Sequence, residues 1–370
     1  MKSRNIWGCL LVFCLVTFSI SAQDESLKIV ASHSILGDVV QNVVGDTAQV
    51  QITMSVGTDP HSFQPVPSDL TQLADADIVF VNGAGFEEGL LESIENAGTD
   101  MTIVEVSSCV PMLTFDDELH HDHDYEHEEH EDEDEHEDHK HEDHDDEHED
   151  HNESFEPACN QHNQDLADLS ISEIVLDGSV GALYEADCGD FGCDPHVWMQ
   201  PYYVMLWTLY IRDSLMTIDP NNQAIYEANA TAYIQALQDL MTDMIDPAIA
   251  RIPSENRILV TNHDSLQYFA ASYGFEIAQT IILGGSTVGE PSTSDIVTVI
   301  ERIREDNIST IFSETSMSDD IIRQIANETG TQIITLYSGS LGDADSPAST
   351  YIDYMIHNVT AIADALGINQ

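Results

Sequence analysis

Short apolar runs alternate along most of the chain with segments in which apolar residues recur every three or four positions. Runs such as Ile78–Val81 and Ile258–Val260 are typical of buried strands, and the spacing from Ile35 to Val44, ended by Gly45, is typical of a helix. Strands that alternate with helices predict an α/β fold with parallel sheets covered on both faces. The other expected strands are 27–31, 50–56, 101–106, 310–312 and 332–336, and the other expected helices begin near 67 or span 86–96, 265–273, 295–305, 319–329 and 350–366.

One predicted helix is much longer than the others. Helical apolar spacing continues from Gln223 to Ile249, with Asp219-Pro220 before it and Pro253 beyond its end. The pattern therefore predicts two lobes, each with a parallel sheet flanked by helices, on either side of one long helix. The predicted boundaries are a signal peptide at 1–22, an N-terminal lobe at 23–218, a linking helix at 219–252 and a C-terminal lobe at 253–370.

The first residues have the pattern of a secretory signal. Lys2 and Arg4 precede an apolar run from Trp7 to Ser19, and small residues follow at 19–22. We expect cleavage there, with an uncleaved anchor as the alternative. Cys14 lies inside the apolar run, which is a poor context for lipid attachment, so we expect a free protein without stable membrane insertion rather than a lipoprotein.

A strongly acidic insert interrupts the N-terminal lobe between about 116 and 156. Residues 116–153 contain 23 acidic side chains, and Lys140 is the only basic residue among them apart from histidine. Such a segment has almost nothing to bury, so we expect a disordered loop. The net charge of the whole chain is −58, which argues against nucleic acids and anionic membranes as partners.

Four cysteines remain after the predicted signal. Because an exported protein meets an oxidising compartment, an even number favours disulfides. We favour a short loop closed by Cys188–Cys193 and a bond Cys109–Cys159 across the acidic insert. The alternative is that all four are free and behave as small apolar residues.

Three histidines share one kind of position, just beyond a predicted strand or in a loop. His61 and His196 each follow Asp-Pro, and His263 follows the strand 258–260. Ligands of parallel α/β folds bind at the carboxyl ends of strands. Neutral imidazole is a preferred ligand of Zn²⁺, and three imidazoles with one carboxylate complete a tetrahedral set. The sequence therefore predicts a zinc site, although copper and nickel also suit such ligands.

The acidic insert also contains candidate metal ligands. Eleven histidines lie between His120 and His151, interleaved with aspartate and glutamate. Such tracts bind borderline divalent cations weakly. We therefore expect additional weak Zn²⁺ binding in this loop, rather than a purely solvated spacer.

The arrangement of these segments resembles the metal-specific solute-binding proteins of ABC transporters, the zinc and manganese uptake family. The resemblance covers nearly the whole chain after the signal, and its motifs are specific as a set. The matching segments are Asp59–His61, the acidic histidine run, Asp194–Trp198, Val260–His263, Ile311–Glu314 and Ser349–Met355. The resemblance implies two lobes with the metal in the cleft between them and a limited hinge closure.

The family also implies a fourth ligand, a carboxylate before the last helix. Asp345 is the predicted residue and Asp343 the alternative, since the loop before Tyr351 differs in length among relatives. Glu314 is a further candidate, although a structural carboxylate bonded to backbone amides is the favoured interpretation. A manganese site would tend to have a carboxylate in place of His263, so the resemblance favours zinc.

The predicted function is therefore binding without catalysis. We expect a monomeric periplasmic protein that captures Zn²⁺ and delivers it to an ABC permease, with a periplasmic zinc chaperone as a further candidate partner. Two alternatives remain open. One is a zinc store or chaperone that acts mainly through the histidine-rich loop, and the other is a zinc hydrolase, which would need an open coordination position and a general base.

Overall fold

The computed structural model describes residues 27–87, 89–90, 93, 101–115, 158–189, 192–282, 287, 289 and 291–367 of the 370-residue chain. The predicted signal peptide, the acidic insert and most of the predicted helix 86–96 lie outside these residues. Among the helices described, none combines the length and the apolar character needed to span a bilayer.

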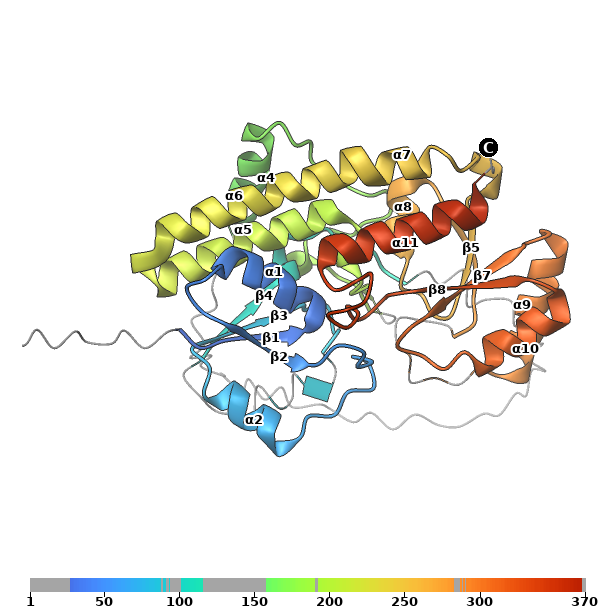
Figure 1. Ribbon diagram of the computed structural model, residues 1–370, viewed down its shortest axis with the longest axis horizontal. Coiled ribbons are helices and arrows are strands. Elements are labelled where there is room, and N and C mark those ends of the chain that lie inside the picture. The colour runs from blue at the N-terminus through green and yellow to red at the C-terminus, as the bar shows by residue number, and fades with distance from the viewer. Residues whose placement is uncertain are drawn as a thin grey trace, which may run out of the picture.

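The first half of the chain builds a four-stranded parallel sheet with the order β2-β1-β3-β4. Its central strands are fully buried and mostly apolar, as expected for a sheet covered on both faces. The sheet lies on the left in Figure 1, with helix α1 on one side and α2 on the other. The elements are β1 (Ile29–His33), α1 (Ser34–Val44), β2 (Val50–Met54), α2 (Pro67–Ala74), β3 (Ile78–Val81) and β4 (Thr102–Glu105).

The last third of the chain builds a second sheet with the equivalent order, β6-β5-β7-β8, also parallel. Helices α9 and α10 cover its outer face, on the right in Figure 1. Helix α8 ends at Gly274, whose positive φ of 69° suits a residue without a side chain. The elements are β5 (Ile258–Thr261), α8 (Gln267–Tyr273), β6 (Glu276–Thr280), α9 (Thr293–Glu305), β7 (Thr310–Glu314), α10 (Asp320–Thr329), β8 (Gln332–Leu336) and α11 (Tyr351–Leu366).

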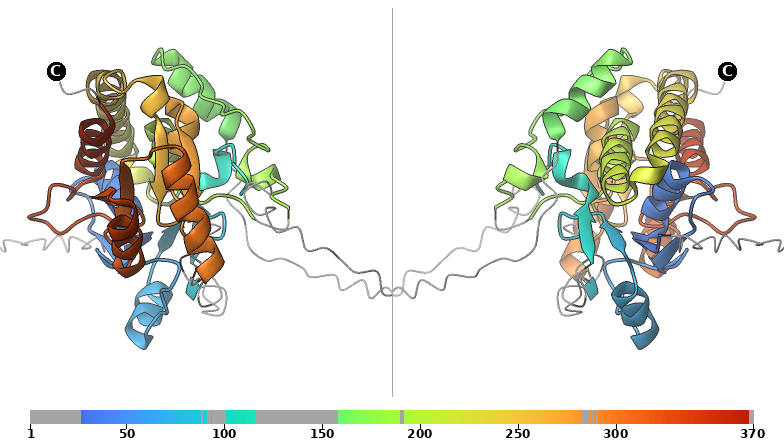
Figure 2. Two further views of the ribbon diagram at one scale, coloured as in Figure 1. Left: turned by 90° about the vertical axis from the view of Figure 1, so that its right-hand side faces the viewer. Right: turned by 90° about the vertical axis from the view of Figure 1, so that its left-hand side faces the viewer.

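A continuous helical rod extends over both sheets. It consists of α6 (Gln223–Asp239), a π-helical turn (Leu240–Ile245) and α7 (Asp246–Ile249). The widened turn lies directly before Pro247, which has no N–H for the helical ladder. Figure 1 shows this rod across the top of the molecule, with α5 and α11 beneath it. Figure 2 shows the same layer of helices from both ends.

One apolar core joins the two lobes. It includes Ile78 of β3, Leu237 of α6 and Phe312 of β7, so the helical layer packs on both sheets at once. The predicted α/β fold, with two parallel sheets and a long linking helix, is therefore confirmed. The predicted pattern lacked α4 (Cys159–Asp168), the buried helix α5 (Pro201–Ile218) and the strand β6.

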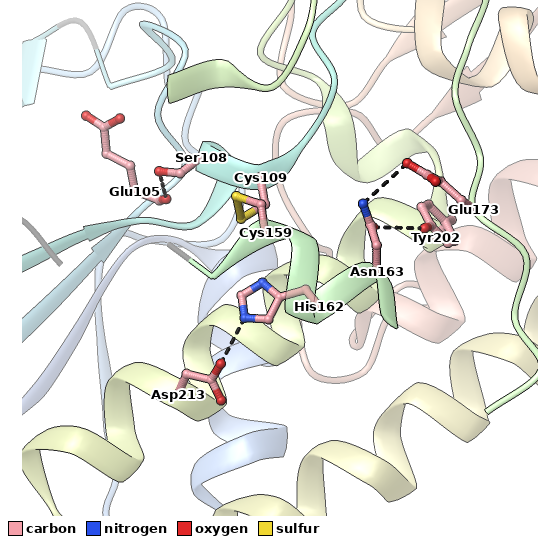
Figure 3. The surroundings of a disulfide bond; sticks show 9 residues. All are labelled: Glu105, Ser108, Cys109, Cys159, His162, Asn163, Glu173, Tyr202 and Asp213. Carbon is pink, nitrogen blue, oxygen red and sulfur yellow. Dashed lines mark hydrogen bonds and ion pairs between the residues drawn. A yellow bond between two sulfur atoms is a disulfide. The ribbon is translucent and has the colours of Figure 1, made fainter. Parts of the chain in front are cut away.

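Two disulfides have the predicted pairing, Cys109–Cys159 and Cys188–Cys193, with Cα–Cα distances of 5.1 and 5.0 Å. Figure 3 shows the first of them joining α4 to the 3₁₀ turn after β4. Beside it, His162 on α4 bonds Asp213 on α5, with 2.9 Å between Nε2 and Oδ2. The helix that follows the acidic insert is thus fixed to the N-terminal lobe by a covalent bond and a partly buried polar contact.

Candidate metal centre

The structure brings together the three histidines that the sequence selects. His61 lies in the loop after β2, His196 precedes a 3₁₀ turn that leads into α5, and His263 lies two residues beyond β5. One ring nitrogen from each lies within 4.8 Å of those of the other two. All three side chains are buried, with exposed fractions of 7%, 1% and 2%. This is the arrangement that a site for one small cation requires.

His263 is oriented by a carboxylate from the neighbouring strand. Its Nδ1 lies 2.7 Å from Oε1 of Glu314, the last residue of β7, and that carboxyl is also buried. If Nδ1 carries the proton and donates it, Nε2 is free to bind a metal. Nε2 lies 3.4 Å from Nε2 of His196, so it faces the centre of the group.

His196 is oriented in the same way by a residue of its own loop. Asp194 Oδ1 accepts from the backbone N–H of His196 at 2.9 Å and lies 2.7 Å from its Nδ1. Asp194 is completely buried. Its carboxylate therefore fixes both the backbone turn and the ring, and again leaves Nε2 for a ligand.

His61 has no such partner. Both of its ring nitrogens are buried without a hydrogen bond in the described part of the protein. Its ring packs edge-on against Phe86 at 5.4 Å between centroids, and Trp198 packs on His196 at 5.3 Å. Buried imidazole nitrogens without a partner are costly, and a bound cation would satisfy one of them.

Burial and neighbouring charges set the protonation of the group. Burial lowers the pKa of His61 to about 3 and that of His196 well below its ordinary value, so both rings are neutral. Burial also acts to lower the pKa of His263, but the Glu314 carboxylate outweighs it and raises the pKa. Burial raises the pKa of Asp194 to about 7. Two neutral imidazoles beside a histidine–carboxylate pair favour a divalent cation that displaces protons.

Segments of the two lobes meet around the histidines. Ser340 Oγ accepts from the backbone N–H of Gly57 at 2.7 Å, and Thr287 Oγ1 donates to Asp59 Oδ2 at 2.6 Å. Gly339 lies so close to Pro60 that an added Cβ would be 3.1 Å from the proline ring. The loop that carries His61 is therefore covered by residues of the C-terminal lobe.

The predicted carboxylate ligand is not in this group. Asp345 and the alternative Asp343 are both exposed in the turn before α11. Sequence spacing did not fix the path of this loop, so it could not place either side chain. Glu314 does lie at the site, but it contacts the ring of His263 rather than backbone amides. Asp194 is a participant that the sequence analysis missed, although the repeated Asp-Pro-His segment marked its position.

The sequence matches the model of a known family over residues 29–365, nearly the whole described chain. That family is the periplasmic component A of the zinc-uptake complex. The chain belongs to this family. Zinc-uptake component A proteins are the substrate-binding parts of metal importers of the ABC type and are not enzymes.

Individual relatives of this chain differ in the metal they are named for. The manganese-binding lipoprotein MntA of Halalkalibacterium halodurans is 29% identical over 374 residues, covering 99% of each chain. The iron-binding protein YfeA of Yersinia pestis is 26% identical and covers 93% of this chain and 87% of its own length. The family therefore establishes binding of a divalent metal but leaves its identity open.

Solved structures confirm the two-lobe fold of this chain. The periplasmic zinc-binding protein TroA of Treponema pallidum superimposes with a TM-score of 0.67 at 21% identity, covering 92% of this chain and 99% of its own. The manganese-bound periplasmic metal-binding protein of Candidatus Liberibacter asiaticus gives a TM-score of 0.63 at 25% identity, with coverages of 91% and 98%.

Proposed function

We propose that this protein captures Zn²⁺ in the periplasm and delivers it to the permease of an ABC importer. The observation that supports zinc is the ligand set, three buried imidazoles of which two are oriented by carboxylates. Nitrogen ligands suit Zn²⁺, whereas Mn²⁺ prefers oxygen-rich sites. In this proposal His61, His196 and His263 are the ligands, and Asp194 and Glu314 orient two of them.

The fourth position of the proposed site is the least defined. The sequence prediction of Asp345 stays a prediction, and the exposed turn would have to move for its carboxylate to reach the histidines. If substitution of Asp345 by alanine weakens zinc binding more than the same change at Asp343, the turn closes over the metal. If neither change matters, the three histidines hold zinc without a carboxylate from this loop.

The acidic insert has a secondary part in the proposal. Its clustered histidines would bind zinc weakly and raise the local concentration near the site, which favours transfer when zinc is scarce. The proposed partners are the permease and, as a further candidate, a periplasmic zinc chaperone. We propose a monomer released by cleavage of its signal, although MntA is named a lipoprotein. Mass spectrometry of the mature N-terminus distinguishes the two.

Metal analysis tests the proposal directly. Protein purified from the periplasm without added metal should contain about one equivalent of tightly held zinc. Calorimetric titration of the stripped protein should give one tight site for Zn²⁺, a much weaker one for Mn²⁺, and additional weak zinc sites. Tighter binding of Mn²⁺ than of Zn²⁺ would overturn the choice of metal. Many equivalent sites without a tight phase would favour the zinc-storage alternative.

A further inference from the structure

Two buried tyrosines of the C-terminal lobe hold the segment that carries His196. Tyr268 on α8 donates its hydroxyl hydrogen to the carbonyl of Asp194 at 3.1 Å. Tyr351 at the start of α11 donates to the carbonyl of Trp198 at 2.6 Å. The two carbonyls belong to the residues two positions before and two positions after His196. Both tyrosine side chains are completely buried.

The N-terminal lobe holds the same segment from its other side. The backbone N–H of Asp194 donates to the carbonyl of Leu113 at 2.8 Å, and Asn82 Nδ2 donates to the carbonyl of Pro195 at 3.1 Å. The hydroxyl of Tyr268 also accepts from the backbone N–H of Leu113 at 3.0 Å, so it bridges the two lobes. The hydrogen bonds of the His196 segment are complete only while both lobes are in contact.

We propose that Tyr268 and Tyr351 are positioning residues that couple closure of the lobes to the placement of His196. The inference rests on the proposed function, since it concerns how the same site holds its metal. When the lobes separate, either the tyrosine hydroxyls lose their acceptors or the segment moves with the C-terminal lobe. In the first case His196 stays with His61 and separates from His263, and in the second case it moves with His263 and separates from His61. Either way the three histidines no longer surround one position. Zinc release is thereby tied to opening.

Three substitutions of one kind test the coupling. Tyr268→Phe and Tyr351→Phe each remove one hydroxyl and keep the ring. Tyr203→Phe is the matched control, because Tyr203 is also buried and also donates to a backbone carbonyl, that of Ile174 at 3.3 Å. That carbonyl lies far along the sequence from any of the three histidines. A similar loss of melting temperature in all three metal-free variants would show that the changes disturb folding alike.

The rate of zinc release to a chelator is the first measurement. We expect release to accelerate about two- to tenfold in Tyr268→Phe and in Tyr351→Phe, the range that corresponds to one neutral hydrogen bond, and to stay unchanged in Tyr203→Phe. Equal rates in all three variants would overturn the inference. Absence of a tight zinc site in the unmodified protein would instead refute the proposed function.

The second measurement needs no metal. Spin labels at Leu70→Cys on α2 and Val297→Cys on α9, both exposed, report the distance between the lobes. We expect longer or broader distances in the metal-free Tyr268→Phe and Tyr351→Phe proteins than in the unmodified protein or Tyr203→Phe. Identical distributions in all four proteins would contradict the coupling, whatever the zinc titration shows.

Discussion

The tripeptide Asp-Pro-His occurs twice at the site, and its two copies hold their histidines differently. In the copy at 194–196 the buried carboxylate accepts from the backbone N–H and contacts the ring of its own histidine. In the copy at 59–61 the half-buried carboxylate of Asp59 accepts from the backbone N–H of His61 at 3.2 Å but does not contact its ring. Its other hydrogen bonds are with the hydroxyls of Ser62 and Thr287. Identical residues therefore build one oriented ligand and one whose ring is fixed by packing alone.

The difference follows from the surroundings of each copy. The segment at 194–196 is enclosed by Leu113, Asn82 and Tyr268, so its carboxylate has little alternative to the adjacent ring. The other copy lies five to seven residues beyond β2, in a loop where hydroxyl groups compete for the carboxylate. We infer that His196 and His263 form a preset pair and that His61 adjusts to the metal.

Removal of one of the three histidines should have the largest effect on zinc affinity. We expect His61→Ala, His196→Ala and His263→Ala each to abolish tight zinc binding, with losses beyond the 10- to 100-fold typical of orienting residues. Competition with a chromogenic chelator measures the affinity. If His61→Ala still holds one equivalent of zinc tightly, the preset pair is the whole site and the comparison of the two copies loses its basis.

Neutralising the aspartate of each Asp-Pro-His copy should change the zinc affinity by different amounts. Asp194→Asn should weaken zinc binding about 10- to 100-fold, because Asp194 orients a ligand ring, and Glu314→Gln should act similarly through His263. Asp59→Asn is the matched control, and we expect less than about a threefold change because Asp59 does not touch the ring of His61. Chelator competition with all three variants measures these changes in zinc affinity. Equal losses for both aspartates would mean that charge, not orientation, governs affinity.

Acidification should affect His263 before His61. Burial acts to lower the pKa of His263, but Glu314 raises it above its ordinary value, so zinc must displace a proton from this ring up to a higher pH than from an ordinary histidine. Burial lowers the pKa of His61 to about 3, so its ring needs no deprotonation. Zinc affinity should therefore rise with pH up to the raised pKa of His263 and level off above it.

Calorimetry in two buffers of different ionisation enthalpy measures the protons released on zinc binding. In Glu314→Gln the pKa of His263 should fall, so fewer protons should leave near neutral pH. An unchanged number of protons in this variant would show that His263 is not the group that zinc deprotonates.

Deletion of the acidic insert should have the smallest effect on the cleft. The insert follows Leu113, whose carbonyl accepts from the backbone N–H of Asp194. The deletion therefore also tests whether the placement of the Asp-Pro-His copy at 194–196 depends on the insert. Removing 119–152 should lower the total zinc bound and leave the tight affinity nearly unchanged, since the removed residues include almost nothing apolar. The lost weak binding should be the part that fades near pH ~6.5, the ordinary range of histidine. Loss of the tight phase would favour the storage alternative.

The sequence predicted the strands and the long helix because their apolar periods are regular. It missed α5, whose residues from Pro201 to Ile211 are all buried, because a helix that is apolar on every face has no period to detect. It missed β6 because polar residues interrupt the strand at Glu276 and Gln279. Apolar runs and helical periods therefore identified the central strands and the amphipathic helices, and they failed for a helix buried on every face and for a polar edge strand.

The candidate site also has features that could be predicted from the sequence and features that could not. The clustering of the three histidines was predictable because they follow strands or share a motif, and these features are local. The roles of Glu314 and Asp194 were not, because each depends on which atom a buried carboxylate meets after folding. The exposure of Asp345 depends on the path of a loop that no local rule fixes.

The bond Cys109–Cys159 has a consequence for the life of the protein outside the cytoplasm. It joins residues on either side of the acidic insert, 50 positions apart in sequence. A protease that cuts anywhere in the insert therefore yields two polypeptides that stay covalently linked and keep all three histidines in one molecule. Such nicked protein would run as a single species until a reductant separates its fragments. A cut in the histidine-rich segment therefore does not cause the two parts of the protein to separate.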